Sequence, residues 1–118
     1  MRFNCGTEQK NFAIRVFEMV EKLPESRGVE VIANQLIKAS TSVAANYRAV
    51  CRAKSKADFI NKLKIVEEES DESLFWLEFI VDLRLMDKKL LESLTKEANE
   101  FVAIFTAAVK TSKANYKS

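Results

Sequence analysis

Two carboxylates, Glu69 and Glu72, come closest in type and spacing to catalytic chemistry. Residues three apart on a helix share one face, as a general acid and base or two magnesium ligands would. The chain has no histidine, which excludes Ser-His and Cys-His nucleophiles, histidine zinc sites and the Glu-x-x-His ligands of di-iron bundles. Its two glycines stand apart, so it has no glycine-rich phosphate loop. We therefore favour a solvated or ion-paired role for both carboxylates, and expect no enzyme activity, metal or cofactor.

Basic residues gather in one stretch of the chain. Positions 48 to 64 hold one carboxylate, Asp58, and six cations, which are Arg48, Arg52, Lys54, Lys56, Lys62 and Lys64. Such a cluster can bind phosphate groups, although a net charge of +2 does not by itself indicate nucleic-acid binding. The acidic run 67–72 follows, and it supports the alternative of a solvated face paired with nearby carboxylates.

An apolar stretch, residues 73–86 (SLFWLEFIVDLRLM), carries the strongest functional signal. A helix in a four-helix core needs one apolar stripe, but this stretch has a second one on another face. The large side chains of the second face and its edge are Phe75, Trp76, Phe79, Leu83 and Met86. Excess apolar surface predicts a subunit interface that includes Phe75, Trp76, Phe79 and Leu83. The alternative is a larger core within one chain.

The two cysteines, Cys5 and Cys51, are too few and too scattered for a disulfide framework or a zinc site, so we expect free thiols. The first six residues lack the apolar core and cleavage site of a secretory signal. No apolar run approaches the roughly 20 residues that span a bilayer. These features predict a cytoplasmic protein without a membrane segment.

The sequence predicts that all of these residues lie on helices or in the short turns beside them. A chain of 118 residues suits one domain, and two glycines with one proline favour long helices joined by short turns. We predict an all-α, up-down-up-down antiparallel four-helix bundle with left-handed packing and a frayed tail after residue 112. Thr7, Ser55 with Asp58, and Asp87 are the predicted N-terminal caps. The helices should span about 8–23, 29–52, 56–85 and 88–112.

One polar residue, Asn46, falls at a core position in the heptad pattern of the second helix. A lone core asparagine is typical of a residue that fixes helix register. A ligand-binding amide is the alternative.

Four segments together resemble a known family: Leu23-Pro24, residues 35–46 (QLIKASTSVAAN), residues 55–63 (SKADFINKL) and residues 69–77 (ESDESLFWL). They are similar to the four-helix-bundle proteins first known as products of intervening sequences in bacterial 23S ribosomal RNA genes. The same family includes the accessory variability determinant proteins of diversity-generating retroelements. Those proteins are pentameric barrels that bind nucleic acid and a reverse transcriptase, so the resemblance implies a ring-like homo-oligomer, such as a pentamer, with these partners.

The family pattern also suggests a polar cluster, which in this chain would hold Asn46, Glu69 and Glu72. Members commonly have a glutamate three residues after the asparagine, where this chain has Ala49. The cluster is therefore expected to lack one carboxylate.

The leading hypothesis is a non-enzymatic, homo-oligomeric bundle that binds nucleic acid through the basic region 48–64, with RNA or an RNA-protein complex as its target. The alternative is a structural or protein-protein interaction module that recruits its partner through the second apolar face.

Overall fold

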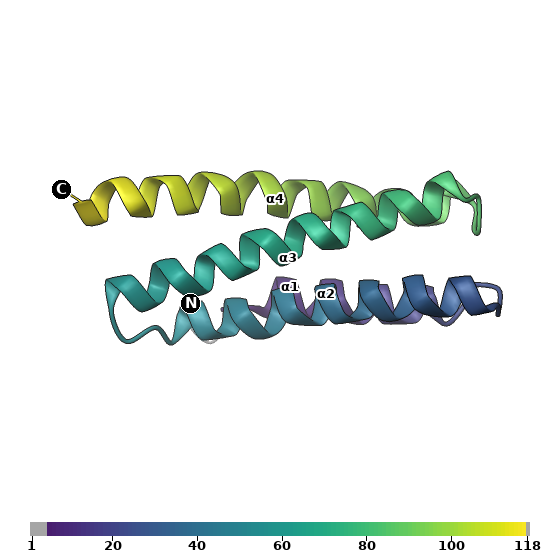
Figure 1. Cartoon of the computed structure of the whole chain (residues 1–118), viewed down its shortest axis with the longest axis horizontal. Coiled ribbons are helices and arrows are strands. Elements are labelled where there is room, and N and C mark those ends of the chain that lie inside the picture. The colour runs from purple at the N-terminus through teal and green to yellow at the C-terminus, as the bar shows by residue number, and fades with distance from the viewer. Residues whose placement is uncertain (1–4, 118) are drawn as a thin grey trace.

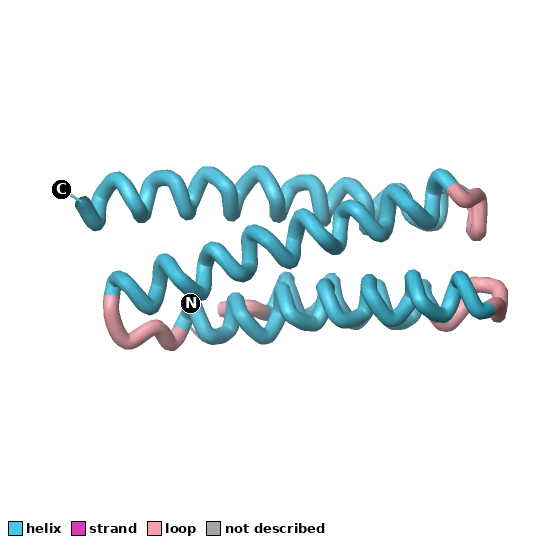
Figure 2. Tube along the Cα trace, in the orientation of Figure 1, coloured by secondary structure: helices cyan, strands magenta, loops and turns pink. Residues whose placement is uncertain are grey.

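Four antiparallel helices make up the computed structural model, which describes residues 5–117 (Figure 1). They are α1 (Thr7–Val20), α2 (Arg27–Cys51), α3 (Lys56–Asp82) and α4 (Lys88–Lys117), and no strand occurs among the described residues. The bundle measures 49 × 25 × 23 Å. Short loops join consecutive helices at alternate ends, as Figure 2 shows, which confirms the predicted all-α, up-down-up-down architecture. None of these helices is long and apolar enough to cross a membrane.

Two of the predicted caps are present. Ser55 has an extended backbone and its Oγ accepts a hydrogen bond from the Asp58 N–H at 3.0 Å. Asp87 Oδ1 accepts one from the Lys89 N–H, also at 3.0 Å. Each cap satisfies an N–H of the first helical turn that has no partner within its own helix. These caps place the start of α3 and of α4 at the predicted residues.

The start of α1 differs from the prediction, because Thr7 does not cap it. Gly6 takes the capping position with a φ of 88°, and as a glycine it has no side chain that could cap the helix. At Gly6 an added Cβ would lie 3.8 Å from Tyr47 and 3.9 Å from the Arg48 backbone. Glycine adopts this left-handed conformation without steric cost, so the chain turns tightly into α1 against the end of α2.

The ends of three helices also differ from the prediction. α1 ends at Val20 and α3 at Asp82, three residues earlier than predicted in each case, whereas α4 continues to Lys117 and the tail does not fray within the described residues. α3 stops because Arg84 has a φ of 56°. The Arg84 N–H donates to Val81 O at 3.0 Å and the Leu85 N–H to Ile80 O at 3.4 Å, the hydrogen-bond pattern of a Schellman termination.

The core runs along the centre of the bundle and takes apolar residues from all four helices. Phe12 of α1 and Phe101 of α4 meet edge to face with ring centroids 5.2 Å apart. The burial of apolar surface, which contributes about 25 cal/mol of stabilisation per Å², is the main force that holds the helices together. Fully buried members, one from each helix, are Val16, Leu36, Leu77 and Leu91.

The buried stripes of α3 and α4 each shift by one residue from regular heptad spacing. Regular spacing would bury Phe59 and Ala108, whereas the structure buries Ile60 and Val109, leaves Phe59 37% exposed and packs the half-buried Ala108 against the core. A straight helix drifts by about 20° per heptad relative to a 3.5-residue repeat. The buried stripe therefore passes to the adjacent residue toward the helix ends.

A polar link joins α1 to α4. Arg15 forms an ion pair with Glu97, and its second guanidinium nitrogen donates to Ser93 Oγ at 2.9 Å. Because α1 has 14 residues and α4 has 30, α1 covers only part of its neighbour. The link helps to fix the position of the shortest helix.

Candidate nucleic-acid interface at the end of α2 and start of α3

A shallow groove lies at the connection between α2 and α3, and we call it the basic groove. Its volume is about 780 Å³, and four of its lining residues are cations: Arg48, Arg52, Lys54 and Lys62. Ala45 and Ala49 form part of its wall, and their small side chains leave the groove open. Arg48 and Arg52 share a helix face because they are four residues apart. The fold therefore brings together four of the six predicted phosphate-binding residues.

Asp58 is the one carboxylate among the described residues that line the basic groove. Its Oδ2 accepts a hydrogen bond from the Lys54 N–H at 3.2 Å, while its own N–H donates to Ser55 Oγ. Asp58 thus fixes the short connection between the helices and holds the backbone of Lys54 at the edge of the groove. Its position follows from capping α3.

The groove cations have no carboxylate partner: among residues 5–117, none of the four forms an ion pair. The acidic run 67–72 begins five residues after Lys62, which is about 7.5 Å farther along α3, and ends about 15 Å away. That range spans the screening length of about 8 to 10 Å near physiological salt. The acidic run therefore weakens the field of the groove without neutralising it through direct contacts.

The other two predicted phosphate-binding residues lie outside this groove. Lys56 lines a separate pocket at the same end of the bundle, together with Lys54 and both cysteines. Lys64 is half-buried on α3 and lines neither cavity. Sequence proximity alone does not separate these two lysines from the other four, because the separation depends on how α3 is rotated in the bundle.

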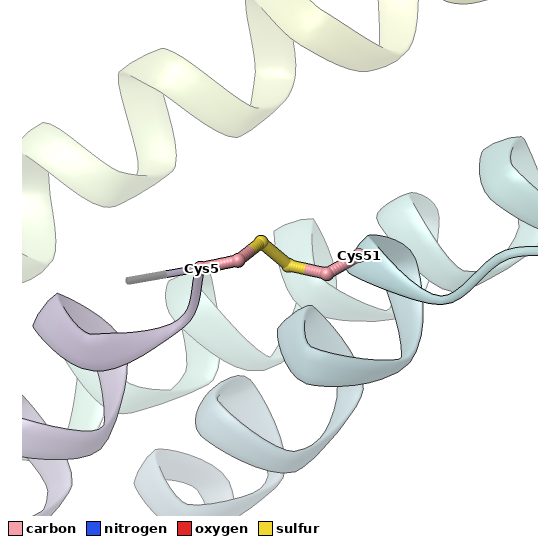
Figure 3. Close-up of a disulfide and its surroundings, with 2 residues drawn as sticks. All are labelled: Cys5 and Cys51. Carbon is pink, nitrogen blue, oxygen red and sulfur yellow. A yellow bond between two sulfur atoms is a disulfide. The ribbon is translucent and has the colours of Figure 1, made fainter. Parts of the chain in front are cut away.

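The prediction of free thiols is wrong in this structure, because a disulfide joins Cys5 to Cys51 (Figure 3). The cysteines are 46 residues apart in sequence, yet their Cα atoms are 6.3 Å apart. Cys5 precedes α1 and Cys51 is the last residue of α2, so the antiparallel arrangement of the two helices brings both to one end. The Cα separation lies within the usual range for disulfides. No composition rule could reveal this pairing.

The proposed polar cluster does not come together around Asn46. Its side-chain amide donates to Ser42 O and Ser42 Oγ, both at 2.9 Å, within its own helix. Burial raises the pKa of Glu69, the charge of Glu72 raises it further, and Lys38 lowers it. Lys38 precedes Asn46 by eight residues, or about 12 Å along α2. Glu69 and Glu72 thus interact with each other at another level of the bundle from Asn46.

The second apolar face of α3 is largely exposed. Phe75 is 51% exposed, Phe79 37% and Leu83 48%. Phe75 and Phe79 pack against the half-buried Trp76, with ring centroids 4.8 and 5.6 Å from it. Trp76 Nε1 is buried without a hydrogen-bond partner among the described residues. The bundle therefore covers Trp76 and Met86 in part and leaves Phe75, Phe79 and Leu83 of this face, which we call the aromatic face, exposed.

Among the described residues, no group of three or more cysteine, aspartate and glutamate side chains is placed to hold a metal ion. Cations, in contrast, converge in the basic groove. The arrangement suits recognition of an anion by charge.

Comparisons with known proteins place the chain in a family. The model of the 23S rRNA-intervening sequence protein family matches residues 3–107. A crystal structure of a protein of unknown function from the S23 ribosomal protein family of Bacteroides thetaiotaomicron is similar, with a TM-score of 0.80 and 28% identity over 90% of this chain and 98% of that one. A search of curated proteins found no match. On the match over residues 3–107, the chain belongs to the 23S rRNA-intervening sequence protein family.

Proposed function

We propose that this protein is a homo-oligomeric bundle that binds nucleic acid through the basic groove, with RNA, alone or carried by a protein such as a reverse transcriptase, as its target. The observation that carries the proposal is the convergence of Arg48, Arg52, Lys54 and Lys62 on one groove. None of the four is paired with a carboxylate of residues 5–117. Unpaired cations around a shallow groove are a general feature of phosphate-binding surfaces.

The side chains suit phosphate in different ways. Arg48 and Arg52 present planar guanidinium groups that bind two phosphate oxygens at once, about 6 Å apart along α2. Lys54 and Lys62 add point charges from the connection and from α3. Contacts of this kind bind the sugar-phosphate backbone of the nucleic acid and do not distinguish one base from another. Binding should therefore be tolerant of sequence and sensitive to salt.

Self-association would multiply a weak site. The aromatic face gives a surface for contact between copies, because Phe75, Phe79 and Leu83 are exposed. In a ring of several copies, such as a pentamer, each subunit would contribute one basic groove. Phosphate contacts that are weak one by one would then add through avidity.

The experiment is a titration of fluorescent duplex RNA at about 50 mM salt with wild-type protein and Arg48→Glu/Arg52→Glu. The matched control, Lys22→Glu/Arg27→Glu, changes the net charge by the same amount at the opposite end of the bundle, where both residues are exposed. We expect the groove variant to lose at least about tenfold in affinity, because two phosphate contacts are replaced by repulsion. The control should lose much less. Equal losses in both variants would show that binding depends on net charge alone and would contradict the role of the groove.

A protein-protein interaction module without nucleic-acid binding is the second candidate, and the aromatic face favours it. This candidate predicts no RNA binding at micromolar protein. It also predicts that the charge reversals change nothing, while substitutions on the aromatic face abolish recruitment of the partner.

A further inference from the structure

The disulfide lies in the wall of a pocket. This pocket, which we call the cysteine pocket, has a volume of about 530 Å³. Both cysteines line it, together with Lys54 and Lys56. Cys5 and Cys51 are themselves exposed. A small molecule can therefore reach the sulfur atoms, and an anion entering the pocket meets two ammonium groups.

We propose that Cys5 and Cys51 form a reversible redox site that exchanges with small anionic thiols, which the two lysines attract to the disulfide. The pocket accounts for both parts of the proposal. An exposed disulfide is open to attack by a thiolate, whereas a buried one is shielded from it. Lys54 and Lys56 raise the local concentration of a negatively charged attacker.

The exchange needs two equivalents of thiol and no other reactant. In the first step the thiolate sulfur bonds to a protein sulfur, the Cys5–Cys51 bond breaks, and the departing protein thiolate takes a proton from water. In the second step another thiolate attacks the sulfur of the small molecule in the mixed disulfide. This step releases the remaining protein thiolate and a small-molecule disulfide. Two electrons pass from the two small thiols to the protein, and the reverse sequence restores the bond.

The helix ends indicate which sulfur is attacked. Cys5 stands just before the N-terminus of α1, whereas Cys51 is the last residue of α2. Partial positive charge at a helix N-terminus stabilises a thiolate, and partial negative charge at a helix C-terminus disfavours one. Since the more stable thiolate leaves faster, Cys5 should leave and Cys51 should carry the mixed disulfide.

The test compares the rates at which oxidised wild-type protein is reduced under native conditions by mercaptoacetate, which is anionic, and cysteamine, which is cationic. Rates are corrected for the thiolate fraction and nucleophilicity of each reagent, and products are counted by mass spectrometry after acid quench. We expect mercaptoacetate to react at least about tenfold faster at 10 mM salt, where screening extends to about 30 Å. The preference should nearly vanish at 1 M salt, where the screening length is about 3 Å.

Two variants identify the cause of the preference. Lys54→Gln/Lys56→Gln should bring the rate ratio close to one, whereas Lys22→Gln/Lys89→Gln, which removes the same charge at the opposite end, should leave it unchanged. Peptide mapping should find the trapped mixed disulfide on Cys51. A ratio near one in the wild type, a ratio that survives the Lys54/Lys56 substitutions, or a disulfide that resists both thiols until the protein unfolds would overturn the proposal.

Discussion

Removal of the disulfide should cost a large share of the stability of this bundle. In Cys5→Ser/Cys51→Ser the unfolded chain regains the freedom of a loop that the disulfide closes across 46 residues. The chain-entropy relation gives about 4 kcal/mol at 25 °C for a loop of this size. With an unfolding entropy of about 2.1 cal/mol/K per residue, 118 residues give a decrease in Tm of about 15 °C. Urea and thermal unfolding followed by circular dichroism measure both quantities.

Reduced wild-type protein serves as the control for this measurement. It lacks the covalent link but keeps both sulfur atoms, so it should unfold at nearly the same midpoint as the serine variant. Oxidised wild type should unfold at higher urea and with a smaller m-value, because its unfolded state exposes less surface. Coincident midpoints for oxidised wild type and the serine variant would contradict this prediction, since they would mean that the disulfide does not restrain the unfolded chain.

The helix cap at Ser55, the exposed aromatic face and the raised pKa of Glu69 can each be tested by substitution. Ser55→Ala should lower the free energy of unfolding by about 1 kcal/mol, because the Asp58 N–H loses its cap; an unchanged urea midpoint would contradict this. Phe75→Glu/Leu83→Glu should reduce the oligomeric mass measured by light scattering while the helical signal is retained, whereas Ile104→Glu on exposed α4 surface should not; an unchanged mass would remove the aromatic face from the interface. Because burial and Glu72 raise the pKa of Glu69, its carboxyl favours folding below the ordinary glutamate pKa and loses that contribution as pH rises through the folded-state value. The free energy of unfolding of Glu69→Gln should therefore rise relative to that of wild type as pH increases from acid to neutral in urea titrations, and a constant difference would contradict the raised pKa.

Local signals in the sequence predicted most of the fold. Pro24 separates the first two helices, and Ser55 and Asp87 cap the next two through hydrogen bonds that depend only on nearby residues. The sequence did not predict the end of α3, because Arg84 adopts the left-handed backbone conformation. A glycine usually occupies that position and marks the helix end in the sequence. The sequence did not predict the Cys5–Cys51 disulfide either, because these residues are far apart in sequence and meet only after α1 and α2 pack together.

The candidate site was predictable in composition and less so in geometry. Six cations between positions 48 and 64 mark the region, but the rotation of α3 decides that Lys62 joins the basic groove while Lys64 does not. Asn46 illustrates the same limit, because it hydrogen-bonds to Ser42 of its own helix and does not join the glutamates. Heptad position predicts the face of the helix on which a residue lies, whereas its side-chain partners depend on how the neighbouring helix is placed beside that face.

The salt dependence of RNA affinity is the sharpest measurement of binding through the basic groove, because it counts phosphate contacts. If the four cations of one basic groove each contact a phosphate, the affinity of wild-type protein for duplex RNA should fall roughly a hundredfold between 50 and 200 mM salt. Arg48→Glu/Arg52→Glu should reduce the slope of log affinity against log salt by about half, and Lys22→Glu/Arg27→Glu should leave it unchanged. No RNA binding at micromolar wild-type protein, or a slope that is the same in the groove variant and the wild type, would contradict the account.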